Sequence, residues 1–154
     1  VRGMKLQDGQ AVISLLVAED DQQTVLVATE NGFGKRTVLA DFRHSGRGTQ
    51  GVKAIADSER NGVVIAAKLV NDDDEVMLIT TGGVLIRTRV SEIRGMGRAT
   101  QGVTLIALDD GEKLAGLEKV AESVGDAGAE VADELADMPA EGDTDAVAGE
   151  AEEN

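Results

Sequence analysis

The sequence contains no cysteine, tyrosine or tryptophan, and it has one histidine, His44, and one proline, Pro139. Without cysteine, neither a disulfide framework nor a cysteine-based zinc site can form. A lone histidine gives no basis for a paired nucleophile and base, so we predict no catalytic residue. No apolar run approaches the length of a membrane span and no signal-peptide pattern opens the chain, so we expect a soluble protein.

Basic residues are missing altogether from the last part of the chain. Residues 1–120 hold all 15 Lys and Arg and 17 of the 29 Asp and Glu, a net charge of −2. Residues 121–154 carry the other 12 acids and no base, a net charge of −12, and they are rich in Ala and Gly. Such a segment cannot bury enough apolar surface to offset its ordering entropy, so we predict a disordered acidic tail over 121–154.

A seven-residue phrase occurs twice, as G-R-G-T-Q-G-V at residues 46–52 and as G-R-A-T-Q-G-V at residues 97–103. The spacing of 51 also aligns residues 25–29 with 76–80, and a shift of 102 aligns residues 1–6 with 103–108. A period near 50 residues is typical of propeller-like arrays. We therefore predict two full repeats and the start of a third, over residues 1–51, 52–102 and 103–120. Because the first repeat begins in mid-pattern and without Met, we expect a piece of a longer protein.

Within each repeat the apolar runs are short and end at turn dipeptides such as Asp8-Gly9 and Asn31-Gly32, which favours strands over helices. These dipeptides tolerate the positive φ that tight hairpins require. In the first repeat the runs cover residues 1–6, 11–18, 24–29 and 34–39. We therefore predict that each full repeat forms one four-stranded antiparallel blade. The whole chain is predicted to have an all-β fold of about two and a half propeller-like blades. Since Phe33 and Phe42 are the only aromatic residues, we expect an aliphatic core.

Two motifs admit other interpretations. Residues 46–51 match G-x-G-x-x-G, the fingerprint of a dinucleotide site, which needs a helix directly after it. Residues 52–56 predict a short strand instead, and the second copy has Ala99 in place of the second glycine, so we interpret the phrase as a connector between blades. The acidic clusters at 19–21 and 72–75 occupy the same place in two repeats, and we interpret them as solvated turns rather than as a Mg²⁺ site.

Basic residues recur at equivalent positions beside the phrase and in the hairpin before it. They are Lys35, Arg36, Arg43, Arg47, Arg87, Arg89, Arg94 and Arg98. If the blades fan around an axis, these positions fall along one rim, where an arginine row would follow a phosphate backbone without reading base sequence. Pairing of the same arginines with local acids such as Asp41 and Glu92 explains the pattern equally well, so both interpretations stay open.

Three stretches carry a resemblance to a known family: T-E-N-G-F-G-K-R-T at residues 29–37, the run over 72–93, and the phrase at 97–103. They resemble the C-terminal domain of the bacterial DNA gyrase A protein, and the likeness covers residues 1 to about 120. The resemblance implies a six-bladed β-pinwheel whose blades exchange strands with their neighbours. It implies that a basic rim binds and wraps double-stranded DNA. It also implies a bacterial, cytoplasmic and nucleoid-associated protein that does not act at a membrane.

The family's domain is part of a type II topoisomerase, a heterotetramer of gyrase A and gyrase B proteins that negatively supercoils DNA with ATP. The resemblance implies that ATP and Mg²⁺ act in other domains, so we expect no cofactor and no metal here. The catalytic tyrosine also belongs elsewhere, and we expect no DNA cleavage by this chain. The family's wrapping phrase Q-R-R-G-G-K-G is absent, although residues 43–48 and 94–97 echo it. The resemblance implies that Arg43, Arg47, Arg94 and Arg98 match positions that face DNA, and that Lys35, Arg36, Arg87 and Arg89 match such positions more loosely. The acidic tail is expected to modulate binding.

Two alternatives remain. The related C-terminal domain of the topoisomerase IV A protein has fewer and more degenerate blades, so the regular repeats favour the gyrase domain. A propeller-type protein-interaction scaffold without DNA binding is the other alternative. Arginines at equivalent blade positions favour DNA binding over such a scaffold.

Overall fold

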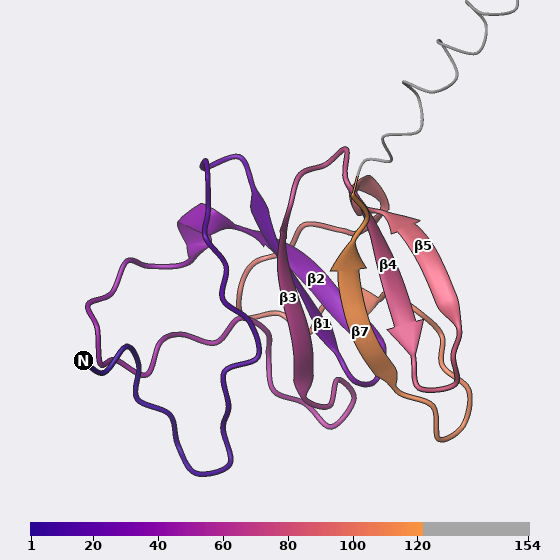
Figure 1. Cartoon of the computed structure of the whole chain (residues 1–154), viewed down its shortest axis with the longest axis horizontal. Helices are drawn as coiled ribbons and strands as arrows, with labels where there is room; N and C mark the ends of the chain where they lie inside the picture. Colours follow the sequence, from indigo (N-terminus) through magenta and orange to yellow (C-terminus); the bar gives the residue numbers. More distant parts are fainter. Residues whose placement is uncertain (122–154) are drawn as a thin grey trace, which may run out of the picture. The chain divides into compact units, whose positions relative to one another are not determined.

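The computed structural model describes residues 1–121, and residues 1–120 form one all-β unit (Figure 1). The fold class predicted from the sequence is confirmed. The elements are β1 (Thr24–Thr29), β2 (Phe33–Val38), η1 (Leu39–Asp41), β3 (Val64–Val70), β4 (Glu75–Thr80), β5 (Leu85–Arg89), η2 (Val90–Glu92), β6 (Val103–Thr104) and β7 (Leu114–Lys119). The prediction of a disordered tail falls on residues that lie, after Ala121, outside the described part. Among the described residues, no helix has the length and apolar character needed to cross a membrane.

The strands form two antiparallel sheets. One has the strand order β3-β1-β2-β6 and the other has the order β5-β4-β7. In the β1–β2 hairpin Thr24 lies opposite Val38, and in the β4–β5 hairpin Glu75 lies opposite Arg89. Both residues of the second pair lie 51 positions after those of the first pair, so the two hairpins have the same register, as the repeat in the sequence predicts.

Each sheet takes a strand from the following repeat. β3, from the second repeat, pairs with β1 of the first, and β7, from the third repeat, pairs with β4 of the second. β3 and β7 come next to each other where the two sheets meet (Figure 1). The strand exchange implied by the resemblance is confirmed. The prediction that each repeat folds into its own blade is wrong, because the outer strand comes from the next repeat.

The first 18 residues form no strand, although two strands were predicted there. Met4 makes only an isolated bridge to Thr49. Val12 and Leu15 are 64% and 87% exposed, whereas the side chains they align with in β7, Leu114 and Leu117, are 2% and 1% exposed. β4 supplies the partner that buries β7, and no hairpin in residues 1–121 pairs with 11–18.

The short strand predicted over residues 52–56 is also absent. Its counterpart β6 forms because β2 offers a free edge, where Phe33 and Gly34 pair with Thr104 and Val103. A short segment becomes a strand only when another strand supplies its hydrogen-bond partners.

The core is aliphatic, as predicted. Its buried members are Leu26, Ala28, Ala66, Val70, Val76, Leu78, Val90, Ile93, Ile106, Leu114 and Leu117. They come from both sheets and from the segments after β5 and β6, so the core joins the two sheets. Each fully buried Val or Leu contributes about 1.5–3 kcal/mol relative to an exposed one.

The two copies of the phrase are irregular segments with glycine at a demanding position. Gly51 and Gly102 have φ of 80° and 83°, a region that residues with a Cβ rarely adopt. Residues 97–102, the second connector, join the η2 turn to β6 in the other sheet, so the interpretation of the phrase as a connector between blades is confirmed for this copy. The first copy, residues 46–51, is called the first connector, and it leads back to β3 in the same sheet as β1 and β2. Residues 19–22 and 72–73 form exposed bends and turns, as interpreted from their acidic composition. Asp74 and Glu75 depart from the interpretation as a solvated turn, because Glu75 begins β4 and both carboxylates pair with basic side chains.

A substitution at Gly34 in β2 tests how closely this strand packs against its neighbours. A Cβ there would overlap with the Val27 carbonyl oxygen and lie 2.5 Å from Leu105 Cδ1. We expect Gly34→Ala to lower the free energy of unfolding by about 1–3 kcal/mol through overpacking, measured by urea denaturation. Gly46→Ala is the matched control, since a Cβ at Gly46 meets nothing within 4 Å. Equal urea midpoints for the two variants would contradict this packing.

Candidate nucleic-acid interface

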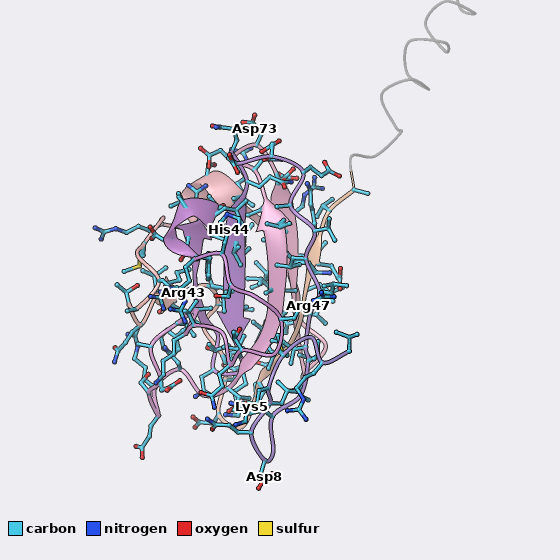
Figure 2. All side chains as sticks on the ribbon, turned by 90° about the vertical axis from the view of Figure 1, so that its left-hand side faces the viewer. Lys5, Asp8, Arg43, His44, Arg47 and Asp73 are labelled. Carbon is cyan, nitrogen blue, oxygen red and sulfur yellow. The ribbon has the colours of Figure 1, made fainter. Side chains whose placement is uncertain are left out.

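Arg43 and Arg47 lie on the long irregular segment between η1 and β3, and both are exposed. Figure 2 shows them on one end of the unit together with Lys5, whereas Asp73 lies at the upper edge. Within the described residues, neither arginine takes part in a salt bridge. Their guanidinium groups are therefore available to an external anion.

The segment of residues 2–5 runs beside the first copy of the phrase. The Gly48 amide donates to the Gly3 carbonyl at 2.8 Å, and the Lys5 amide donates to the Thr49 carbonyl at 2.8 Å. This pairing brings the segment that carries Arg2 and Lys5 next to the one that carries Arg47. Neither Arg2 nor Lys5 was predicted from the sequence, because both lie away from the phrase and from the hairpin before it.

A signal for Arg2 was nevertheless present in the repeat. Arg2 and Lys53 are the second residues of two successive repeats, directly after a valine. Lys53 is exposed and pairs with Asp57, four residues further along the chain. Lys5 has no such counterpart, because the residue 51 positions later is Ala56.

Arg87 and Arg89 lie on β5, the edge strand of the second sheet. Both pair with Glu75 on β4, Arg87 closely and Arg89 at 3.8 Å between Nε and Oε1. The interpretation as local ion pairs therefore applies to these two arginines, although the acid is Glu75 rather than Asp41 or Glu92. In Figure 1, β5 lies on the opposite side of the unit from residues 43–47, so the predicted basic residues do not form one patch.

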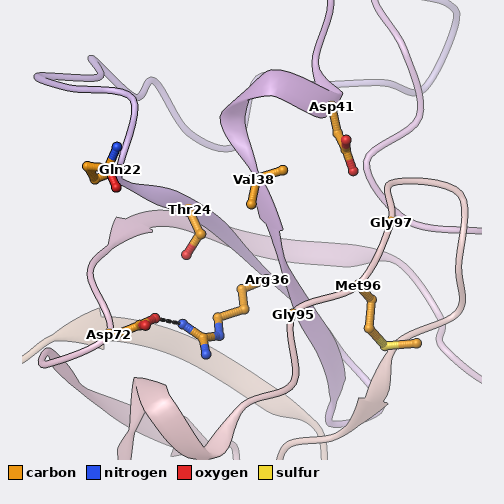
Figure 3. A pocket seen from close by; sticks show the side chains of 9 residues that line it. All are labelled: Gln22, Thr24, Arg36, Val38, Asp41, Asp72, Gly95, Met96 and Gly97. Carbon is orange, nitrogen blue, oxygen red and sulfur yellow. Dashed lines mark hydrogen bonds and ion pairs between the residues drawn. The ribbon is translucent and has the colours of Figure 1, made fainter.

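Arg36 is only 14% exposed at its side chain and is held from two sides. Its Nε donates to the Ile93 carbonyl at 2.5 Å, and its Nη1 pairs with Asp72. Figure 3 shows this pair in a pocket that also contains Asp41 and Met96. Because Asp72 already pairs with the guanidinium and Asp41 adds a second carboxylate to the pocket lining, the pocket does not favour a phosphate.

Lys35 is fully buried, with 0% of its surface exposed. The expectation that it lies on a basic rim is therefore wrong. Lys35 is on β2, and residues 97–100 of the second connector cover it, since its Nζ donates to the carbonyls of Gly97 and Arg98. Burial, and secondly the charge of Arg98, lower the pKa of Lys35 against the opposing charge of Asp41.

Arg94 precedes the second connector and Arg98 lies on it, and the two side chains differ in their surroundings. Arg94 is exposed and has no salt-bridge partner among residues 1–121. Arg98 is half-buried, and it donates from Nη1 to the Lys53 carbonyl at 2.9 Å and from Nε to the Asp41 carbonyl at 3.3 Å. It contacts the backbone of Asp41 and not its carboxylate, so its charge is not neutralised by that contact.

Three exposed arginines with free charge therefore remain from the predicted set: Arg43, Arg47 and Arg94. Arg43 and Arg94 follow η1 and η2 at positions that the 51-residue spacing relates, whereas the counterpart of Arg47 is the half-buried Arg98. A guanidinium matches the geometry of a phosphate through two parallel N–H donors. The arrangement can hold anionic groups at several separated points and contains no constellation for covalent chemistry among the described residues.

Comparison with known proteins agrees with this fold. Residues 1–19, 23–71 and 74–121 match the family model described as DNA gyrase C-terminal domain, beta-propeller. The DNA gyrase A protein of Pseudomonas aeruginosa is 54% identical over 125 residues, which cover 81% of this chain and 13% of that protein. The Escherichia coli K12 protein is 47% identical over 143 residues, which cover 93% of this chain and 16% of that protein. The chain thus spans about a sixth or less of the length of these relatives.

Solved structures give the same result. A DNA gyrase A C-terminal domain superposes with a TM-score of 0.73 at 27% identity, over 79% of this chain and 41% of that chain. The C-terminal domain of a DNA topoisomerase IV superposes with a TM-score of 0.75 at 22% identity, over 90% of this chain and 43% of that chain, which is a likeness of fold alone. The matched family model and the sequence identity to gyrase A proteins show that the chain belongs to the family of β-propeller C-terminal domains of DNA gyrase A.

Proposed function

We propose that this unit binds the backbone of double-stranded DNA without reading its sequence, as the DNA-wrapping part of a gyrase A protein. The proposal rests on Arg43 and Arg47. Both side chains are exposed on the same end of the unit (Figure 2), and neither forms a salt bridge with an acidic residue in the described part of the chain. Guanidinium groups on irregular surface segments are suited to phosphate contacts, which fix the position of a duplex but carry no base specificity.

The predicted residues do not contribute equally to this function. Arg43, Arg47 and Arg94 are the primary contacts, and Lys5 and Arg2 add positive charge beside Arg47. Arg98 is a secondary contact, because it is half-buried but its hydrogen bonds to backbone carbonyls leave its charge unneutralised. Arg87 and Arg89 contribute less, because Glu75 pairs with both and partly neutralises their charge. Arg36 and Lys35 are held inside the unit and support it instead of touching DNA.

In the whole protein, this unit would bend a DNA segment and deliver it to the parts that cut and pass the strands. The gyrase B protein would provide ATP hydrolysis in the heterotetramer, so the chain needs no cofactor of its own. The setting would be the cytoplasm of a bacterium, at the nucleoid. These roles rest on the membership of the gyrase family and on the basic connector residues.

The acidic segment after Ala121 is proposed to lower the DNA affinity of the unit. Residues 121–154 carry 12 acids and no base, while residues 1–120 are nearly neutral. A net charge of −12 on the same chain repels the phosphate backbone and offers an alternative counter-charge to the arginines.

A protein-interaction scaffold without DNA binding remains the alternative from another class. A topoisomerase IV domain fits less well, since its solved structure is 22% identical to this chain against 27% for the solved gyrase A domain, and the matched family model is that of the gyrase domain. The scaffold would be supported if the unit captured a protein partner in nuclease-treated extract and bound no duplex.

Arg47 and Arg43 give the most direct test of the DNA-binding surface. In a fluorescence anisotropy titration with a mixed-sequence duplex, Arg47→Ala should weaken binding roughly three- to tenfold at low salt, since one charge-assisted contact is lost. The slope of log K against log salt should become shallower by about 0.9. Arg43→Ala should behave in the same way.

Arg87→Ala is the matched control, because this arginine is exposed but shares Glu75 with Arg89. We expect its effect on affinity to stay within about twofold and its salt slope to remain near that of the unchanged chain. Absence of any duplex binding at low salt, in the full chain and in a chain ending at Ala121, would refute the proposed function.

Removal of the acidic segment should have the opposite effect. A chain ending at Ala121 should bind the same duplex at least roughly threefold more tightly at low salt, because the like-charge repulsion is removed. The difference should disappear at about 0.3 M salt, where charges of this kind are screened. A scrambled segment of the same composition is the control, and it should restore the weaker binding. Equal low-salt affinities of the full and shortened chains would contradict the effect of charge.

A further inference from the structure

The second connector follows the outer edge of β2 at both ends and leaves it in the middle. At one end the Met96 amide donates to the Arg36 carbonyl at 2.9 Å. At the other end Val103 and Thr104 pair with β2 as strand β6. Between these ends, the carbonyls of Gly97 and Arg98 fall outside the strand pairing, and apart from the amide and hydroxyl of Thr100, which donate to Gly97 within the turn, they depend on other donors.

Lys35 supplies these donors from inside the unit. Its Nζ donates to the Gly97 carbonyl at 2.6 Å, to the Arg98 carbonyl at 2.5 Å and to Thr100 Oγ1 at 3.1 Å. A lysine ammonium has three donors, and all three are used here. With 0% of its surface exposed, the side chain has no remaining contact with solvent.

The opposite side of the connector is fixed by the segment before β3. The Ala56 amide donates to the Thr100 carbonyl at 3.0 Å, and Asn61 Nδ2 donates to the Gln101 carbonyl at 2.9 Å. On the surface, Arg98 spans the carbonyls of Asp41 and Lys53. The connector is therefore held between β2 on one side and residues 53–61 on the other.

The first copy of the phrase has no such lysine contact among the described residues. It is held by the backbone of residues 3–5 and by its own turn, in which Thr49 Oγ1 donates to the Gly46 carbonyl at 3.3 Å. In the second repeat, the residue that aligns with Lys35 is Ile86, which is exposed on the edge of β5. Lys35 therefore has no counterpart in the second repeat. It lies in the β1–β2 hairpin, and among the described residues this is the one hairpin that has a connector along its edge strand.

We propose that Lys35 is a buried positioning residue, which fixes the connector of residues 97–102 and thereby sets the placement of Arg98 on the DNA-binding surface. Lys35 does not contact DNA. Its ammonium group donates hydrogen bonds to connector carbonyls that have no partner on a neighbouring strand. The effect on DNA rests on the proposed function above, while the effect on the connector does not.

The protonation of Lys35 gives an independent readout of its burial. Burial and Arg98 lower its pKa from the ordinary value of 10.5, with Asp41 acting in the opposite direction. The unfolded chain then binds more protons than the folded chain just below pH 10.5, so the free energy of unfolding rises with pH in that window. In Lys35→Met this contribution should be lost, which urea denaturation at a series of pH values measures. A pH dependence shared by both proteins would contradict a perturbed Lys35.

A pair of threonine variants isolates the contact between Lys35 and the connector under mild conditions. Thr100→Val removes a turn hydrogen bond and one acceptor of Lys35, whereas Thr49→Val removes only the equivalent turn bond in the first copy. By hydrogen exchange on the full chain without DNA, the amides of Ala56 and Met96 should exchange about tenfold faster in Thr100→Val. They should be unchanged in Thr49→Val. Unchanged exchange in both variants would overturn the positioning of the connector, even if Lys35→Met fails to fold.

The consequence for DNA is tested by a double-mutant cycle with the duplex titration. If Lys35 acts through Arg98, then Lys35→Met weakens binding several-fold alone but adds less than about twofold to Arg98→Ala. It should add its full effect to Arg47→Ala, because Arg47 lies on the other connector. Additive losses with Arg98→Ala would overturn the positioning role. If the unchanged chain binds no duplex, the proposed function fails, while the exchange experiment still decides whether Lys35 holds the connector.

Discussion

Pairing between strands of successive repeats is the interaction on which this unit depends. β1 and β2 form a hairpin whose free side is covered by β3 from the next repeat, and β4 and β5 form a second hairpin that is covered by β7. A two-stranded hairpin is marginal in water, and the added strand supplies both hydrogen bonds and a second row of aliphatic side chains. Because β3 and β7 also contact each other, the same strands that complete the sheets join them into one core.

The second connector follows from this exchange, because a chain that leaves one sheet to complete another must cross between them. In doing so it gives up regular backbone pairing over several residues. Glycines with positive φ, such as Gly102, allow the path, and buried donors such as Lys35 and Asn61 satisfy the carbonyls that the path leaves without strand partners. The exposed arginines near these connectors therefore lie on irregular backbone that the two sheets support.

Much of this arrangement was predictable from the sequence. The 51-residue spacing located both hairpins, and β1 and β2 lie within one residue of the runs expected at 24–29 and 34–39. The aliphatic core followed from the lack of aromatic residues. The surroundings of the basic residues were less predictable, because the sequence does not show which of them have an acidic partner in the fold. Arg87 and Arg89 share Glu75, Arg36 pairs with Asp72, and Lys35 is buried, while Arg43, Arg47 and Arg94 remain exposed.

The sequence by itself determined the repeat, the positions of the turns and the type of side chain in the core, since these depend on residues close together in the chain. Only the tertiary structure decided which runs become strands. Residues 12–17 and 114–119 align in sequence, yet Leu15 is exposed and Leu117 is buried. The reason is physical: a strand needs hydrogen-bond partners on a neighbouring strand, and β4 provides them for one of the two segments. Contacts between residues far apart in the sequence likewise decided that Lys35 is buried while the exposed arginines are not.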